Sequence, residues 1–230
     1  MNMLAACAES TRARALIGLV LAAALGACGS LPSAPAPVAV YDLGPGQVQA
    51  QPSNRMAPLP PLALSDVLAP SALDTLPVVY RLGYSDAQQL RPYAHARWSM
   101  PPAQLLRQRV RETLGQRRAV LNPADGLLLP RDTLTLRLEL EEFSQIFDAP
   151  GSSAGVLRLR ATLTHPQHGT DALLAQRSFV LREPAASADA VGGVRALTAA
   201  VDSAVQQLDQ WLQQSQASLP PPPACLLYTS

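Results

Sequence analysis

The sequence predicts an α+β fold: an antiparallel sheet, with a mixed sheet as the open alternative, and two amphipathic helices packed on one face. Three runs between residues 133 and 183 alternate apolar and polar side chains, which is typical of strands with one buried face. Two other segments repeat apolar residues every three or four positions, the spacing of one helix face. Because one face of a twisted sheet needs covering, two helices of these lengths suffice for a single domain.

The first 27 residues have the pattern of a lipoprotein signal peptide. Arg12 and Arg14 supply positive charge, and residues 15–27 are apolar but too few to span a membrane, which takes roughly 20 residues. Residues 25–28 read Leu-Gly-Ala-Cys and resemble the lipobox of bacterial lipoproteins. That resemblance implies cleavage before Cys28 and a diacylglycerol on its sulfur. The alternatives are a plain signal peptide and a buried helix with a chance cysteine.

The residues after Cys28 bear on where the protein is sorted. Gly29 and Ser30 stand where an aspartate would resemble an inner-membrane retention signal. By resemblance to the sorting rule of enteric bacteria, we expect lipid anchoring at the periplasmic face of the outer membrane. Two or more acyl chains hold a protein stably on a bilayer.

Residues 28–61 are rich in proline and are expected to form a tether between lipid and domain. A short strand is predicted inside it, over residues 38–44, and it would pair with the edge of the sheet or with a partner. A coil of about 30 residues spans roughly 30 Å. The tether would therefore lift the domain off the membrane.

The folded domain is expected over residues 62–214. Residues 62–71 are interpreted as a strand or an apolar loop, and residues 77–85 as a strand because valine and tyrosine favour sheets. Residues 92–98 are interpreted as a connection.

The first helix is predicted to begin at the Ser99–Pro102 stretch and to end near Gly115, since serine caps helices and proline suits the first turn. Its apolar face would carry Ala103, Leu106, Val110 and Leu114. Four arginines are expected mostly on the opposite face: Arg107, Arg109, Arg111 and Arg118.

A short strand and turn over residues 119–126 is expected to lead into an antiparallel meander. Its strands are predicted at residues 133–143, 156–164 and 172–183, where the alternation is clearest. The doublet Glu141–Glu142 shifts the phase of the first run, and a β-bulge there explains the shift.

The last predicted element is a long helix from about Asp189 to Gln214. Gly192 and Gly193 near its start predict a frayed first turn. Residues 215–230 are expected to be a disordered or artefactual tail, because a proline run followed by CLLYTS is an unusual domain ending.

Composition excludes several classes of function. A net charge of +1 gives no reason to expect nucleic-acid binding, and no sequence motif of a catalytic or phosphate-binding loop is found. One cysteine lies in the leader and another would carry lipid, so no intramolecular disulfide is expected. The pair His165 and His168 falls in a predicted turn, and we expect neither a metal nor another cofactor.

An aromatic cluster precedes the first helix and contains Tyr80, Tyr84, Tyr93, Arg97 and Trp98. It can be interpreted as a packed corner in which Trp98 closes the helix start. It can also be interpreted as a partner-contact surface, since Tyr, Trp and Arg are common interface anchors.

Several of these motifs together resemble the ABC-type transport auxiliary lipoprotein family, whose best-known member belongs to the paraquat-inducible intermembrane system. The matching residues follow the lipobox in order: Tyr41, Leu43, Tyr93, Arg97, Trp98 and Pro102. The resemblance covers roughly residues 38–214. It points to Tyr41, Tyr93, Arg97 and Trp98 as the candidate contact surface.

The resemblance implies a non-enzymatic role. Such lipoproteins are outer-membrane partners of MCE-domain proteins, which form lipid-carrying tunnels across the periplasm, while an inner-membrane ABC permease and ATPase drive the traffic. The cargo would be phospholipid or another hydrophobic molecule. A homo-oligomer is expected because the partners are rings. The alternatives are an outer-membrane assembly lipoprotein that escorts or plugs a β-barrel, and a lipid-tethered periplasmic enzyme.

Overall fold

The computed structural model describes residues 37–46, 59–126, 128–130, 132–167 and 170–217. The expected signal peptide, Cys28 and the last thirteen residues lie outside this part of the chain. The elements follow in chain order: β1 (Ala39–Tyr41), β2 (Leu62–Leu68), β3 (Pro77–Leu82), β4 (Asp86–Trp98), α2 (Pro102–Gly115), β5 (Val120–Leu121), the 3₁₀ turn η1 (Pro123–Asp125), β6 (Leu134–Ala149), β7 (Ser152–Gln167), β8 (Thr170–Pro184) and α3 (Ala190–Ala217).

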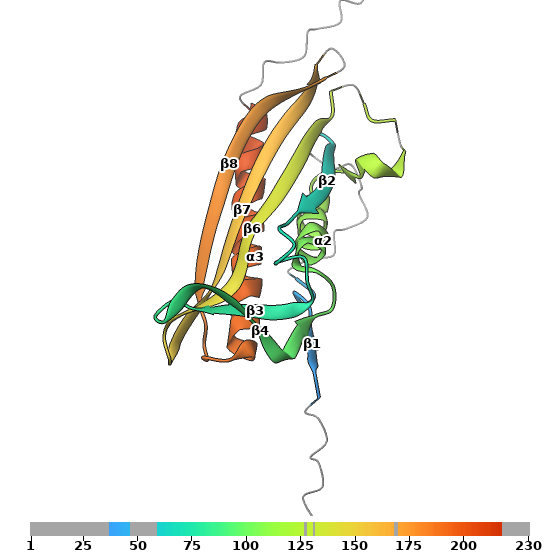
Figure 1. The fold of residues 1–230 in the computed structure, drawn as a ribbon. Helices are drawn as coiled ribbons and strands as arrows, with labels where there is room; N and C mark the ends of the chain where they lie inside the picture. The colour runs from blue at the N-terminus through green and yellow to red at the C-terminus, as the bar shows by residue number, and fades with distance from the viewer. Residues whose placement is uncertain (1–36, 47–58, 127, 131, 168–169, 218–230) are drawn as a thin grey trace, which may run out of the picture. The chain divides into compact units, whose positions relative to one another are not determined.

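The long strand β6 organises the sheet (Figure 1). One of its edges pairs with β7 antiparallel, and β7 pairs in turn with β8. Its other edge pairs in parallel with β2 near its start and with β3 near its end. The sheet is therefore mixed, which is the second of the two arrangements that the sequence left open, and the α+β class is confirmed.

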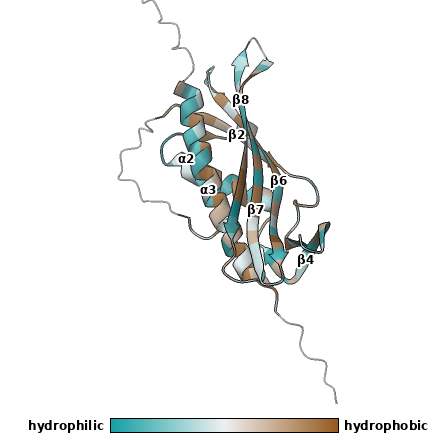
Figure 2. Ribbon diagram, turned by 90° about the vertical axis from the view of Figure 1, so that its left-hand side faces the viewer, coloured by the Kyte–Doolittle hydropathy of each residue, from teal (hydrophilic) through white to brown (hydrophobic). Residues whose placement is uncertain are grey.

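Each helix packs on a different part of this sheet. Helix α3 contacts β6, β7 and β8, and α2 contacts β2 and α3. Along β6–β8 hydrophobic and hydrophilic residues alternate (Figure 2), as the period of two requires. The buried members of these strands and of both helices form one hydrophobic cluster.

The bulge expected at Glu141–Glu142 is confirmed. Leu140 pairs with Leu159, but Glu142 pairs with Arg158, so β6 gains one residue at this point. The extra residue returns the next apolar side chain, Phe143, to the core, where it is 2% exposed.

The connection expected at residues 92–98 is wrong, because these residues belong to the 13-residue strand β4. Strand β4 pairs antiparallel with β3 and parallel with β1. Its polar composition and Pro92 disguise it in the sequence, since proline is rare within strands. The strands expected at residues 156–164 and 172–183 are likewise too short, because β7 covers Ser152–Gln167 and β8 covers Thr170–Pro184.

The fraying expected at the start of α3 is also wrong. Asp189 Oδ1 accepts a hydrogen bond from the Gly192 backbone N–H at 2.8 Å and from Ser187 Oγ at 2.7 Å, which caps the helix. Gly193 packs on the sheet so closely that a Cβ would meet Gln145 Oε1 at 2.0 Å. The glycine serves a close approach of helix to sheet.

Two arginines expected in water are buried: Arg109 on α2 and Arg118 just after it are 4% and 1% exposed. Arg118 Nη1 donates to Gln216 Oε1 at 3.0 Å and ties the end of α2 to the last turns of α3. Burial lowers the pKa of Arg118. Within the described residues, the helices lack any stretch with the length and apolar character of a membrane span.

Candidate functional site at the first strand

The short segment that contains β1, residues 37–46, is built into the domain. Strand β1 pairs in parallel with the end of β4, in register Ala39 with Ala96 and Tyr41 with Trp98. The Ser99 backbone N–H donates to the Tyr41 carbonyl at 2.7 Å. The compact unit therefore includes the segment from Val38 onward, together with the domain expected over residues 62–214.

Arg109 holds this segment from the side of α2. Its Nη2 donates to the carbonyls of Leu43 and Gly44, the latter at 2.9 Å, and its Nη1 lies 3.6 Å from Asp202 Oδ1 on α3. Leu43 itself is 5% exposed and belongs to the core. One guanidinium thus joins α2, α3 and the segment, which its planar array of donors allows.

The turn after β1 needs glycine twice. Gly44 and Gly46 have φ of 66° and 65°, in the left-handed region. Asp42 Oδ1 accepts from the Gly44 N–H at 2.7 Å and fixes the turn. A Cβ on Gly46 would lie 1.8 Å from Arg109 Nη1, whereas a Cβ on Gly44 would meet nothing within 4 Å.

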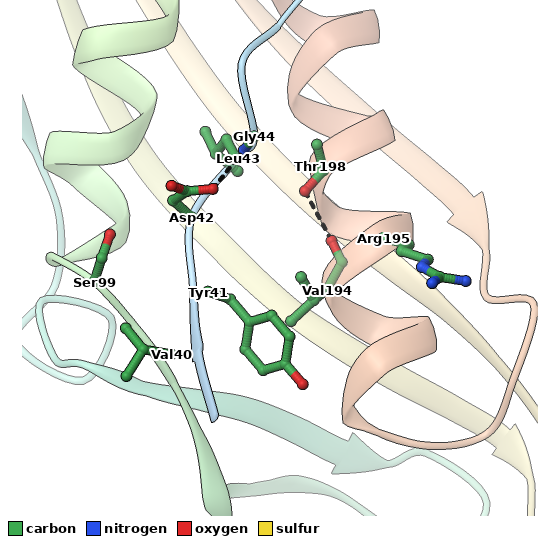
Figure 3. A pocket seen from close by; sticks show the side chains of 9 residues that line it. All are labelled: Val40, Tyr41, Asp42, Leu43, Gly44, Ser99, Val194, Arg195 and Thr198. Atoms are coloured by element: carbon green, nitrogen blue, oxygen red, sulfur yellow. Dashed lines mark hydrogen bonds between the residues drawn. The ribbon is translucent and has the colours of Figure 1, made fainter. Parts of the chain in front are cut away.

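Open space adjoins the segment toward both helices. A shallow pocket of about 460 Å³ is lined by residues 40–44, Ser99 and the first turns of α3, namely Val194, Arg195 and Thr198. A second pocket of about 220 Å³ is bordered by residues 42–44 and by α2. Figure 3 shows the segment between the two helices, with Tyr41 directed toward α3. We call the first pocket the β1–α3 groove.

Trp98 does not belong to an exposed contact surface. It is 1% exposed, and its ring lies 5.4 Å from that of Phe143 in the core. Trp98 therefore fits the interpretation as a packed corner, because burial of its large indole ring stabilises the fold.

Tyr93 is half-buried. Its hydroxyl donates to Gln145 Oε1 at 2.8 Å, and its ring lies 4.6 Å from that of Tyr80. Burial, and secondly the neighbouring Tyr80, raise the pKa of Tyr93. Gln145 in turn donates to Ser153 Oγ at 2.8 Å, so Tyr93 ties β4 to the centre of the sheet.

Tyr41 and Arg97 lie on opposite faces of the β1–β4 pair. Arg97 is in register with Val40, and Tyr41 is in register with Trp98. Because successive side chains of a strand alternate between faces, Arg97 and Tyr41 point in opposite directions. The four residues selected from the sequence therefore do not form one surface, although all of them come from the β1–β4 end of the domain.

The sequence analysis missed the residues that hold the segment: Arg109, Asp202 and Gly46. The signal was present for Arg109, because it follows Leu106 by three positions and thus borders the apolar face of the helix. Among the residues that the structure describes, no group of three or more His, Cys, Asp or Glu side chains could hold a metal ion. The geometry at β1 is that of a shallow open groove next to a firmly held strand.

Comparisons with known proteins agree with this fold. A crystal structure of a Xanthomonas campestris protein of the DUF330 family superposes with a TM-score of 0.61 at 18% identity, over 78% of this chain and 97% of that one. Another, of an uncharacterized protein, gives 0.57 at 18% identity, over 76% and 99%. At these identities the likeness shows the fold alone. No curated protein matches the sequence.

The family is shown by the sequence itself. A family model described as the ABC-type transport auxiliary lipoprotein component matches residues 41–209. The match begins at Tyr41 in β1 and ends in α3, so it includes residues 41–46 of the segment, Arg109 and Asp202. The chain therefore belongs to the family of ABC-type transport auxiliary lipoprotein components.

Proposed function

We propose that this protein is the lipid-anchored outer-membrane component of an MCE-type ABC transport system. In this proposal Cys28 carries the lipid, the domain faces the periplasm, and it docks the far end of an MCE-domain tunnel that carries phospholipid between membranes. The protein performs no reaction of its own. The observation that carries the proposal is the family match from β1 to α3.

The β1–α3 groove supports a docking role better than a catalytic one. Its lining combines apolar residues with two hydroxyl side chains, Ser99 and Thr198, and a single cation, Arg195. The described residues that border it include no histidine or cysteine, and Asp42, its one carboxylate, is already engaged by the Gly44 N–H. We assign the partner contact to this groove and to Tyr41 beside it.

Co-purification from membranes tests the partner. The wild-type lipoprotein, extracted in mild detergent, is expected to bring down an MCE-domain protein together with its permease and ATPase. Recovery of a β-barrel in place of an MCE protein would favour the outer-membrane assembly role and contradict the proposal.

A charge reversal locates the contact. Arg195→Glu in the groove is expected to reduce MCE recovery about tenfold or more, because like charges at an interface are strongly unfavourable. The matched control is Arg111→Glu, an exposed arginine on α2 outside this groove, which should recover the partner as wild type does. Equal recovery of the partner by both variants would show that the contact lies outside this groove.

Two further experiments test the lipid anchor and the number of copies in the complex. Radioactive fatty acid should label the wild-type chain and leave Cys28→Ala unlabelled, and equal labelling would remove the anchor from the proposal. Because the partners are ring-shaped, several copies are expected around each tunnel. The mass of the detergent-solubilised complex tests that number.

A further inference from the structure

The sequence between the proposed lipid anchor and β1 is short. Ten residues, 28–37, separate the proposed lipid anchor from Val38, where the compact unit begins. Fully extended, ten residues reach at most about 36 Å, and as a flexible coil they span about 17 Å. The start of β1 is thus held close to the bilayer, much closer than a tether of the full proline-rich length would allow.

The side of the segment that points away from the core carries two exposed valines and, at its end, Asp42, whose Oδ1 accepts the Gly44 N–H. Val38 and Val40 are 42% and 56% exposed, while Tyr41 and Leu43 of the alternate set are partly or fully buried. A short edge strand that exposes valines is an unusual surface for a soluble domain, since such edges are commonly protected by charge. Something other than this domain is expected to cover these side chains.

A cation stands beside the valines. Arg97 is in register with Val40 on the parallel neighbour β4 and is exposed on the same face. The contacts of the described residues give Arg97 no carboxylate within ion-pair distance. Apolar side chains flanked by an unneutralised arginine match the interface of an anionic bilayer, in which acyl chains lie below phosphate groups.

We propose that the outer face of the β1–β4 pair, formed by Val38, Val40 and Arg97, rests on the anionic phospholipid surface that carries the anchor. The inference depends on the proposed lipidation of Cys28. Val40 also lines the β1–α3 groove, so the two contacts adjoin at this residue. Tyr41 and the α3 side of the groove, formed by Val194, Arg195 and Thr198, remain accessible to the protein partner.

A weak contact suffices for this purpose. The anchor already supplies stable attachment, and a short tether keeps the face at a high effective concentration next to the lipid. Two valines and one arginine then orient the domain without needing to bind vesicles alone. The attraction of Arg97 acts within a Debye length, so it weakens as salt is added.

Fluorescence quenching in vesicles tests the orientation. The full lipidated chain carries Cys225→Ser, which leaves one introduced cysteine for a solvent-sensitive dye. The dye is placed at Val40→Cys or, as the control, at Leu173→Cys, which is 65% exposed on β8 in register with Thr164. The vesicles contain phosphatidylglycerol and phosphatidylethanolamine with a nitroxide-labelled lipid.

Quenching at position 40 is expected to exceed quenching at position 173 severalfold, and to fall when the vesicles contain phosphatidylcholine alone or when salt is raised. Arg97→Glu should lower quenching at position 40, whereas Arg177→Glu, an exposed arginine on β8, should leave it unchanged. Equal quenching at both positions, or quenching indifferent to lipid charge, would overturn the proposal.

The same samples separate this inference from the proposed function. Recovery of the MCE partner in detergent does not require a membrane-facing surface, so it should survive Arg97→Glu. Loss of quenching with normal partner recovery would remove the membrane contact alone. Failure of fatty-acid labelling would remove the anchor on which both depend.

Discussion

The segment at β1 and the meander of β6, β7 and β8 are stabilised in different ways. The meander has strands of 16, 16 and 15 residues, and most of their leucines are almost completely buried in the core that α3 covers. The segment has a three-residue strand, one buried leucine and a polar clasp at Arg109. Apolar burial is distributed over many contacts, whereas the clasp concentrates its stabilisation in one side chain. A substitution in the meander should therefore destabilise the whole domain, whereas a substitution at Arg109 should destabilise the segment alone.

The largest effect is expected from a cavity in the meander. Leu157→Ala on β7 removes a side chain that is 0% exposed and lies between Phe143 and Leu181 in the register. Substitutions of this kind cost about 2–5 kcal/mol. The whole domain should lose stability in urea denaturation, including β1. A loss confined to β7 and β8 would mean that the sheet does not unfold as one unit.

Substitution of Arg109 should destabilise the β1 segment strongly but leave the rest of the domain unaffected. Arg109→Ala leaves the Leu43 and Gly44 carbonyls without their donor, and hydrogen bonds to charged groups contribute about 1.5–3 kcal/mol. Hydrogen exchange should accelerate at residues 39–44 and stay unchanged in β7. Arg109→Lys should restore little, because an ammonium lacks the planar fork that reaches two carbonyls and Asp202.

A pair of glycines refines the comparison. Gly46→Ala should cost more than Gly44→Ala, although both require a left-handed backbone, which costs roughly 1–2 kcal/mol for other residues. The difference is steric: only the Cβ at position 46 would collide with Arg109. Thermal melts of both variants measure it, and equal losses would show that the guanidinium can move aside.

The smallest effects are those of pH. Burial, opposed by Arg109, raises the pKa of Asp202, so the folded state binds this proton more tightly. Its contribution is present at pH below the unfolded pKa and is lost as the pH rises through the folded one. Asp202→Asn should abolish that dependence in melts between pH 3 and 7.

The pKa shift of Asp189, and hence its effect on stability with pH, is opposite in sign to that of Asp202. The hydrogen bonds from Gly192 and Ser187 lower its pKa, so its contribution is present above the unfolded pKa and is lost as the pH falls through the folded one. Asp189→Asn should flatten the acid limb of the same melting curve. An unchanged acid limb would mean that the cap contributes nothing through its charge.

The structure also divides the aromatic corner. Trp98 and Tyr93 were selected as contact residues together with Arg97, yet the first packs in the core and the second bonds to Gln145. Residue type could not separate these roles, since interface anchors and core aromatics share the same chemistry. Only the register of β1 on β4 shows which side chains share a face.

The sequence alone determined the elements with a strong period: the meander, both amphipathic helices and the bulge at Glu141. Periodicity is local, because each side chain's burial depends on its own strand or helix, so it can be read from neighbouring residues. The sequence also carried the family motifs and the predicted lipid site at Cys28.

The tertiary structure alone decided that β6 pairs in parallel with β2 and β3, that Pro92 lies within a strand, and that β1 belongs to the domain. These features depend on contacts between residues far apart in the chain: Arg109 binds carbonyls 65 and 66 positions away. No local pattern specifies such a partner. The place of β1 in the domain follows from these carbonyl contacts and from its pairing with β4.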